Sequence, residues 1–553
     1  MYMKKIALIL IIILAFALRV YKITSIPPSL NWDETSIGYN AYSILKTGKD
    51  EWGQFLPLHF KSFGEYKLPA QIYASIPAIY LFGLNEFGIR ITPVFYGTLT
   101  VLLLYFLTQE LFKKKSISLI SSFLLAVSPW HIQLTRASFE SSFSLFWFLF
   151  GLLFLIKGLK NAKWLVVSMI PFVISVYTYN TARVFTPLFL FVFYLLNIKY
   201  LLKNLKYSAF SFLTFVILTL PILPFVLSGD ASARYKLVSI TDDKGLIPRI
   251  EERRNLSQLP VIVTKLIHNR YTYNTYYFSQ NYIAHFTPSF LFIDGAGHRQ
   301  HHVQGVGELY WIQAPFLLFG LYLLIKRKDG SLKILLPWLF LAFVPVSMTN
   351  DSIPNALRTL IAVPVYQIFT AVGIVELVSG ACKLSELIKL KKYTKIILGL
   401  SVVLFSINFG IYLNNYFVKY PINYSRDWQF GNKQAVEYIQ KNQDKYDLVV
   451  FTRSYGEPHT FTLFNLKYDP ASYQNSPNLN RFETFDWVRV LKFDKYYFPD
   501  LGDAGTKYDD IVKANPDKKI LFVGKKGDFP EYKKILERIY FLDGSEAFEI
   551  TAN

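Results

Sequence analysis

Long apolar runs are the feature of this sequence that most constrains its fold. Runs of about 18 or more apolar residues recur along most of the chain, and the charged residues gather in the segments between them. Such runs are typical of transmembrane helices. Only 18% of the 553 residues are Asp, Glu, Lys or Arg, whereas soluble proteins have about a quarter. The sequence therefore predicts a membrane all-α fold over most of its length.

The apolar runs predict about eleven spans. The first follows Lys4 and Lys5 and has no small-residue cleavage site, so we interpret it as an uncleaved helix. Residues 70–84 are also apolar, but this run is short and contains Pro77. We interpret it as a helix at the outer interface or a re-entrant helix, and a twelfth crossing is the alternative. The predicted spans are 5–22, 89–110, 116–130, 141–158, 163–179, 184–200, 207–228, 308–325, 333–348, 356–378 and 394–414.

The loops between these runs alternate in charge. Every second loop is rich in Lys and Arg, and the positive-inside rule assigns those loops to the cytoplasm. The formal net charge of +20 thus reflects cytoplasmic loops and contacts with anionic lipid, and we predict no nucleic-acid partner. The other loops, including residues 23–88 and 229–307, are predicted to face outward. The basic loops are 113–115, 157–163, 199–206, 326–333 and 383–395.

The composition changes near residue 415, where the chain becomes polar. Strand-like runs at Asp447–Thr452 and Lys519–Val523 alternate with helix-like stretches at Lys433–Lys441 and Glu531–Arg538. This pattern predicts a small soluble α/β domain over 416–553, on the outer side of a transmembrane domain over 1–415. The single cysteine, Cys382, excludes an intrachain disulfide.

Two adjacent acids, Asp33 and Glu34, lie in the first outer loop, ahead of a stretch with helical spacing at Tyr39–Leu45. A structural interpretation is that Asp33 caps this helix and Glu34 favours its first turn. A functional interpretation is that one carboxylate is a general base.

A second candidate element, Glu65-Tyr66-Lys67-Leu68-Pro69, directly precedes the apolar run at 70–84. A lysine at this depth can pair with a lipid phosphate. The alternatives are a lysine that extends to the membrane edge and a simple salt bridge between Glu65 and Lys67.

These motifs occur in an order along the chain, and on one predicted side of the membrane, that resemble the GT-C glycosyltransferases. The resemblance is to the protein O-mannosyltransferase branch (family 39), with the lipid A aminoarabinose transferases related. Those families have Glu-Lys-Pro-Pro or Asp-x-His-Pro-Pro at the second element, so Tyr66 is an insertion and Leu68 replaces a proline. Further similar segments are Ser128–His131 with Arg136, Tyr177–Arg183, His301–Tyr310 and Pro354–Thr359.

The resemblance implies a multi-span GT-C helical bundle with interfacial helices in the first outer loop. It also implies inverting transfer of a hexose or pentose from a polyprenyl-phosphate donor, at the outer face of the plasma membrane. The acceptor is a protein or a glycolipid or other glycan, and membrane lipids are further partners. By analogy Asp33 is the first choice for the base and Glu34 the second, and Glu65 lines the same site.

Two further groups of candidate site residues are predicted. Lys67 and Arg358 are predicted to bind the donor phosphate. For Arg136, Arg183 and Arg358, the alternative is a structural role, in which the side chain anchors the end of a transmembrane span. The possible substrate-binding residues are His131, Arg136, Tyr179, Arg183, His301 and His302.

No metal or other cofactor is predicted. A divalent cation held by Asp33, Glu34 and Glu65 is the alternative, because the related oligosaccharyltransferases hold one with carboxylates. His298, His301 and His302 lie together in one loop. A metal site there is less favoured than a role in polar contacts near the substrate. Two other functions stay open at this point, a glycolipid transporter or flippase and a non-catalytic glycan-binding membrane protein.

Overall fold

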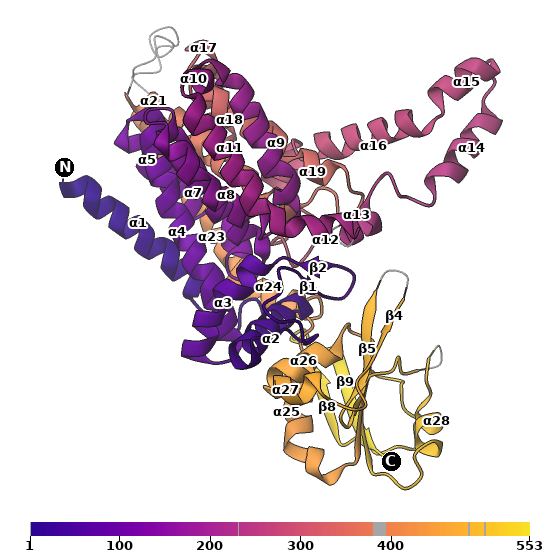
Figure 1. Cartoon of the computed structure of the whole chain (residues 1–553). Coiled ribbons are helices and arrows are strands. Elements are labelled where there is room, and N and C mark those ends of the chain that lie inside the picture. Colours follow the sequence, from indigo (N-terminus) through magenta and orange to yellow (C-terminus); the bar gives the residue numbers. More distant parts are fainter. Residues whose placement is uncertain (1, 230–231, 380–393, 485–486, 503–504) are drawn as a thin grey trace. The chain divides into compact units, whose positions relative to one another are not determined.

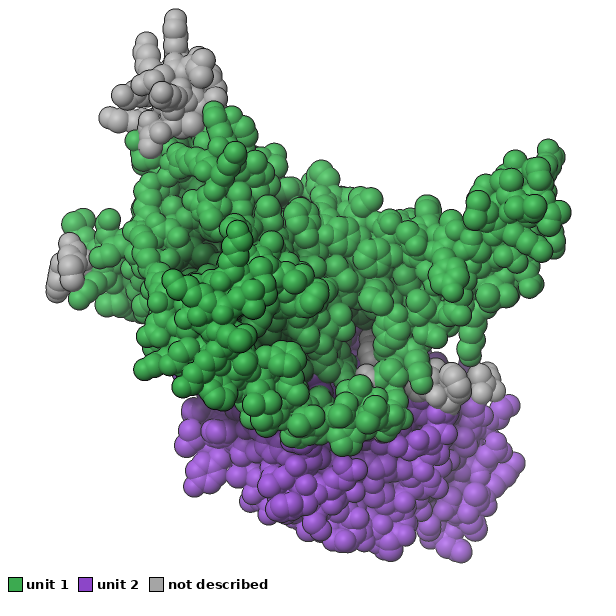
Figure 2. Space-filling view, turned by 45° about the horizontal axis from the view of Figure 1, so that its top comes forward, with its two compact units in different colours: residues 1–18, 96–134, 140–412 green, residues 19–95, 135–139, 413–553 purple. Residues whose placement is uncertain are grey.

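The computed structural model describes residues 2–229, 232–379, 394–484, 487–502 and 505–553. The chain forms two compact units (Figure 2). Unit 1 comprises residues 1–18, 96–134 and 140–412, and unit 2 comprises residues 19–95, 135–139 and 413–553. The predicted domain boundary at residue 415 stays a prediction.

Unit 1 is helical. Three helices, α1 (Tyr2–Val20), α4 (Glu86–Phe112) and α23 (Thr394–Asn414), run from one unit into the other. The other helices of its bundle are α5 (Lys115–Ala126), α6 (Pro129–Leu134), α7 (Glu140–Gly158), α8 (Lys163–Val176), α9 (Asn180–Leu196), α10 (Ile198–Lys203), α11 (Leu205–Thr219), α12 (Leu223–Leu227), α17 (Gln313–Lys326), α18 (Leu332–Ala342), α19 (Val344–Ser347), α20 (Ala356–Thr359) and α21 (Val363–Ser379).

Each predicted span contains all or part of at least one helix. In the described part of the chain, five helical stretches are long and apolar enough to cross a membrane, and five shorter apolar helices accompany them. The protein is a multi-pass membrane protein, and the count of eleven crossings stays a prediction. Most of the basic loop predicted at 383–395 lies outside the described residues. The five long stretches are Glu86–Phe112, Glu140–Gly158, Leu205–Leu227, Ala356–Ser379 and Ile396–Asn423.

Small residues allow two of these helices to approach closely. A Cβ on Gly320 of α17 would lie 2.0 Å from the carbonyl oxygen of Phe369 of α21. A Cβ on Gly373 of α21 would lie 2.0 Å from the carbonyl oxygen of Phe316. Glycine at facing positions is how helices pack when lipid offers no hydrophobic driving force.

A seven-stranded mixed sheet forms the C-terminal part of unit 2. Its strand order is β4-β5-β6-β3-β7-β9-β8, with β3 parallel to both β6 and β7 and the remaining pairs antiparallel. The strands are β3 (Leu448–Phe451), β4 (Asn480–Glu483), β5 (Val488–Phe493), β6 (Tyr496–Tyr497), β7 (Ile520–Gly524), β8 (Glu537–Tyr540) and β9 (Glu546–Ala552). The helices are α24 (Tyr420–Asn423), α25 (Asn432–Asn442), α26 (Pro458–Asn465), α27 (Pro470–Gln474) and α28 (Tyr508–Lys513).

The first outer loop shares its core with this sheet. The loop forms α2 (Trp32–Thr47), a short hairpin of β1 (Phe60–Lys61) and β2 (Tyr66–Lys67), and α3 (Pro69–Phe82). Buried side chains of α2 belong to the same apolar cluster as Val449 of β3 and Phe464 of α26. A Cβ on Gly38 would lie 2.6 Å from the Phe464 ring, so α2 packs on α26 through a glycine.

Three of the four elements named in the tail are confirmed, and one is wrong. The strands near 448 and 520 and the helix near 433 are β3, β7 and α25. The predicted helix at Glu531–Arg538 does not form. Its last residues belong to β8, which pairs antiparallel with β9, and the Leu536 amide donates to the Ile550 carbonyl at 2.7 Å. Pairing at the sheet edge overrides a weak local helical pattern.

The structure contains a helix at the apolar run 70–84, namely α3. Its first residue is Pro69, which suits the first helical position because proline lacks an amide hydrogen. Whether α3 lies at the membrane interface stays a prediction.

Candidate active site

Helix α2 fixes the two adjacent acids, and it begins earlier than predicted. Asn31 is its N-cap, and the Asn31 side chain accepts from the Glu34 amide at 2.9 Å while Glu34 Oε2 accepts from the Asn31 amide at 3.4 Å. This reciprocal arrangement is a capping box. Asp33 therefore does not cap the helix, and that interpretation is wrong. Its side chain lies in the first turn and is available for another role.

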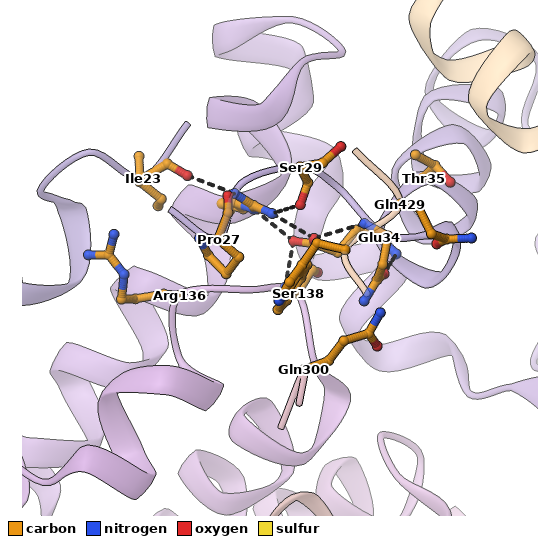
Figure 3. Close-up of polar contacts among 12 residues, drawn as sticks. Ile23, Pro27, Ser29, Glu34, Thr35, Arg136, Ser138, Gln300 and Gln429 are labelled. Atoms are coloured by element: carbon orange, nitrogen blue, oxygen red, sulfur yellow. Dashed lines mark hydrogen bonds and ion pairs between the residues drawn. The ribbon is translucent and has the colours of Figure 1, made fainter. Parts of the chain in front are cut away.

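Glu34 forms a buried ion pair with Arg90 of α4. The Arg90 Nε and Nη2 atoms donate to the two carboxylate oxygens of Glu34, each at 2.9 Å, and both side chains have no exposed surface. The Ser138 amide donates to Glu34 Oε1 at 3.1 Å, and Figure 3 shows these contacts converging on the carboxylate. The contacts favour a structural role for Glu34, because its lone pairs are already engaged.

Arg90 also fixes the start of the first outer loop. Its guanidinium donates to the carbonyl oxygens of Ile23, Pro27 and Ser29, at 2.9, 2.8 and 2.5 Å. All the donors of a bidentate arginine fork are thus used on one loop and one carboxylate. The sequence analysis missed Arg90. The signal was present, because a charged residue inside an apolar helix is costly and marks a specific partner.

Asp33, Glu65 and Lys67 come together, as the sequence analysis predicted. The Lys67 Nζ atom lies 2.5 Å from Asp33 Oδ1 and 3.6 Å from Glu65 Oε1. The hairpin brings them together, because Phe60 pairs with Lys67 in register and the Ser62 amide donates to the Glu65 carbonyl at 2.9 Å. The inserted Tyr66 lies on β2 and pairs with Lys61.

The exposure of these groups differs in a way that matters for chemistry. The Lys67 side chain is 2% exposed, whereas the side chains of Asp33 and Glu65 are 31% and 25% exposed. The cation is thus held inside, and the two carboxylates reach the solvent. The solvent reaches the side chain of Asp33 but not that of Glu34, which distinguishes two acids that are neighbours in sequence.

Aromatic side chains line the same region. The rings of Trp32 and Phe63 lie 5.8 Å apart, and Trp487 lies 5.9 Å from Trp32 and 6.0 Å from Phe63. The Trp487 indole donates to Glu457 Oε1 at 2.6 Å, and the Trp32 amide donates to Gln429 Oε1 at 2.8 Å. The sheet domain therefore supplies part of the surroundings of Asp33, and no sequence signal indicated this.

Arg136, predicted as a possible substrate-binding residue, is buried in unit 2. It donates to the carbonyl oxygens of Arg19, Tyr21 and Ile26 at 3.0, 2.7 and 2.8 Å, and to the Tyr416 hydroxyl at 3.1 Å. These contacts favour the alternative interpretation, an arginine that anchors the end of a span.

The other predicted substrate-binding or phosphate-binding residues belong to unit 1. His131 is buried on α6, and Tyr179 is the N-cap residue of α9. Arg183 bonds to Asn180 in the first turn of α9 and stacks on Phe225. Arg358 pairs with Asp351 at 2.7 Å and donates to the Thr349 hydroxyl at 2.8 Å. Their predicted roles stay predictions.

His301 and His302 differ in their surroundings. The His301 ring stacks on His298 with centroids 3.8 Å apart. The His302 ring is buried, with Nδ1 2.9 Å from Glu308 Oε1 and Nε2 2.7 Å from the Val306 carbonyl. Both ring nitrogens face acceptors, so the doubly protonated ring satisfies both. Burial disfavours the imidazolium, but the Glu308 carboxylate outweighs burial, and the pKa of His302 is raised above its usual value.

This pair predicts a pH-dependent stability of the outer loop. A raised pKa means that the folded state holds the proton more tightly than the unfolded state. The stabilisation is complete below the ordinary histidine pKa of about 6.5 and is lost as the pH rises through the raised pKa of His302. We expect the thermal unfolding midpoint of the wild type to fall across that window. Glu308→Gln should have a lower and flatter profile, and parallel profiles for the two proteins would contradict this assignment.

No group of three His, Cys, Asp or Glu side chains that could hold a metal ion occurs among the residues described by the structure. The sequence-based prediction about cofactors is not tested by this arrangement.

Part of the chain matches a known protein family, and a shorter stretch is similar to a curated protein. Residues 73–225 match the dolichyl-phosphate-mannose-protein mannosyltransferase family. The chain is similar to dolichyl-phosphooligosaccharide-protein glycotransferase 2 of Pyrococcus horikoshii, with 29% identity over 178 residues, which are 28% of this chain and 23% of that protein. The match thus spans less than a quarter of the relative's length.

Solved structures share the fold. ArnT from Cupriavidus metallidurans in the apo state superposes with a TM-score of 0.56 and 12% identity, covering 99% of this chain and 97% of that chain. The same protein bound to undecaprenyl phosphate superposes with a TM-score of 0.53 and 12% identity, covering 98% of this chain and 97% of that chain. The Archaeoglobus fulgidus oligosaccharyltransferase tethered with an acceptor peptide superposes with a TM-score of 0.50 and 16% identity, covering 84% of this chain and 63% of that chain. The predicted resemblance to GT-C proteins is confirmed.

Proposed function

We propose, from the match of residues 73–225 to the dolichyl-phosphate-mannose-protein mannosyltransferase family, that this chain transfers a sugar from a polyprenyl-phosphate donor. Asp33 is the general base, and Lys67 binds the phosphate of the donor. ArnT, which shares the fold, has been solved bound to undecaprenyl phosphate, and this supports a donor of that class.

The observation that carries the proposal is the contact between Lys67 and Asp33. A buried ammonium and a solvent-reachable carboxylate lie 2.5 Å apart in the first outer loop. Glycosyl transfer from a lipid phosphate needs both groups, one to accept the proton of the acceptor and one to stabilise the departing phosphate.

The reaction then proceeds by a single displacement. The acceptor hydroxyl or amine gives its proton to Asp33 as its oxygen or nitrogen attacks the anomeric carbon. The bond from that carbon to the phosphate oxygen breaks on the opposite face, and polyprenyl phosphate leaves with the electron pair. Lys67 stabilises the charge that develops on the phosphate. The configuration of the sugar is inverted.

Binding of the donor changes the partner of Lys67. When the ammonium turns to the phosphate, the carboxylate of Asp33 leaves its contact with Lys67 and can accept a hydrogen bond from the acceptor. Glu65 lies 3.6 Å from the same ammonium and helps to hold it between the two states. Glu34 positions α2 through Arg90 and does not contact the substrate.

The proposed site faces the outer side of the plasma membrane, in agreement with the charge of the predicted loops. We propose a protein or a glycolipid or other glycan as the acceptor, and a hexose or pentose as the transferred sugar. The half-buried rings of Trp32 and Trp487 offer surfaces on which a sugar can stack.

A transfer assay with the full-length protein in reconstituted vesicles tests the proposal. Radiolabelled polyprenyl-monophosphate sugars are supplied with membrane extracts as acceptors, and release of polyprenyl phosphate is followed together with label in the acceptor. We expect both products to appear at equal rates. Transfer from nucleotide sugars alone, or movement of the lipid across the bilayer without transfer, would contradict the proposal.

A further inference from the structure

The outer loop between α12 and α17 carries an arm whose end is apolar and exposed. The arm consists of α14 (Leu246–Leu256), α15 (Val261–Ile267) and α16 (Arg270–Ala284), and Figure 1 shows it leaving the helical bundle of unit 1 to one side. In α15 the buried residue is Thr264, and the other six residues are exposed or partly exposed, with Ile262 83% exposed and Leu266 73%.

The exposed apolar surface continues on both sides of α15. Leu256 and Leu259 precede it with 71% and 50% exposure, and Tyr271 follows with 84%. Apolar side chains gathered in this way on one tip are typical of an interaction surface, whereas scattered ones need no explanation.

The tip is held in a defined conformation by polar contacts. The Arg254 Nε atom donates to the His268 carbonyl at 2.7 Å, which links α14 to the start of α16. The hydroxyls of Ser257 and Thr264 lie 2.9 Å apart, and the Asn269 side chain caps α16 by accepting from the Thr272 amide at 3.0 Å. The apolar side chains are therefore presented outward by a built structure.

Beyond Glu251 and Glu252 of α14, the charged side chains of the arm have one sign. Residues 253–293 contain no Asp or Glu, whereas they contain four cationic side chains, those of Arg253, Arg254, Lys265 and Arg270. Basic side chains around an apolar helix are complementary to a bilayer surface with anionic headgroups. Two copies of the same cationic tip would repel one another, which disfavours self-association.

We propose that the arm inserts α15 into the headgroup region of the membrane that the protein spans, on the side of its outer loops. Ile262 and Leu266 enter the boundary with the acyl chains, and the neighbouring basic side chains contact anionic lipid phosphates. The partner is the phospholipid surface itself. The arm thus holds the long outer loop against the bilayer independently of the chemistry at Asp33.

The test uses the full chain with Cys382→Ser and a fluorescent label on Ile262→Cys, reconstituted into vesicles of phosphatidylglycerol and phosphatidylcholine. We expect nitroxides on the lipid acyl chains to quench this label more strongly than aqueous iodide, by about threefold, as for an interfacial helix. A label on Lys526→Cys is the matched control, because that side chain is 76% exposed in the sheet domain. It should show the opposite preference.

Four outcomes would overturn the proposal. The label on Ile262→Cys behaves like the label on Lys526→Cys, or it is quenched only by iodide. Alternatively, energy transfer between labelled copies rises with the protein-to-lipid ratio while lipid-borne quenching is absent, which would assign the tip to a second copy. Finally, Arg253→Gln with Lys265→Gln should lower the quenching in vesicles that contain phosphatidylglycerol. Equal quenching by lipid nitroxides in the proteins with and without Arg253→Gln and Lys265→Gln would exclude the anionic headgroups as partners.

Discussion

Asp33→Asn is expected to lower the turnover number by about 10²- to 10⁴-fold, the contribution typical of a positioned general base. The amide keeps the size of the side chain and can still accept from Lys67, but it cannot take up the acceptor proton. The affinity for the donor should not fall, because the Lys67 ammonium is no longer neutralised by an anion. Single-turnover rates and donor binding, measured separately on the reconstituted protein, distinguish the two effects.

Two controls make this result specific. Asp543→Asn changes an acid in an exposed turn of the sheet domain that bonds to Ser545, and it should leave the rate unchanged. The unfolding midpoint of Asp33→Asn is measured as well, and rates are compared well below it, because the buried Lys67 ammonium loses one of its two carboxylate neighbours and keeps only Glu65. A rate within about threefold of the wild type would remove Asp33 from the role of base.

Arg90→Leu is expected to have the largest effect on stability. Removing one partner of a buried ion pair leaves the other charge unpaired, which typically costs about 3–5 kcal/mol. Here Glu34 has no exposed surface, and three loop carbonyls lose their donor as well. We expect the variant to accumulate poorly and to lose its monodisperse peak at a much lower temperature during heating in detergent.

The matched control is an ion pair of the same unit at the surface. Lys433 pairs with Glu86, and its side chain is 42% exposed. Lys433→Leu should therefore change stability by less than about 1 kcal/mol, as exposed pairs do. Arg90→Lys keeps the charge but loses the planar guanidinium, so its unfolding midpoint should lie between those of Arg90→Leu and Lys433→Leu. Equal midpoints for Arg90→Leu and Lys433→Leu would show that the buried pair does not hold the loop.

The sequence predicted much of the fold because lipid leaves few alternatives. Backbone groups in hydrocarbon must bond within a helix, so each apolar run could be assigned directly. The same logic fails in the tail. There, Glu531–Arg538 has weak helical spacing, and its conformation is decided by pairing with β9, the next strand along the chain. Pairing between strands depends on the whole sheet, and one segment does not encode it.

The candidate site was predicted in its acids and its lysine but not in their division of roles. Asp33 and Glu34 are adjacent, and adjacency gives no information about which side chain faces a buried cation. The difference arises because Asn31 starts the helix, which turns Glu34 inward to Arg90, 56 residues later in the chain. The aromatic neighbour Trp487 could not be predicted at all, because it comes from a different segment of the sequence.

The core shared by the first outer loop and the C-terminal sheet has a consequence for biosynthesis. The Thr35 hydroxyl bonds to Thr460, 425 positions later, and the Trp32 amide bonds to Gln429, 397 positions later. The segment that carries Asp33 leaves the ribosome early, yet its partners emerge only after the helices of unit 1 have been synthesised. The shared core around Asp33 can therefore assemble only after residue 460 has left the ribosome.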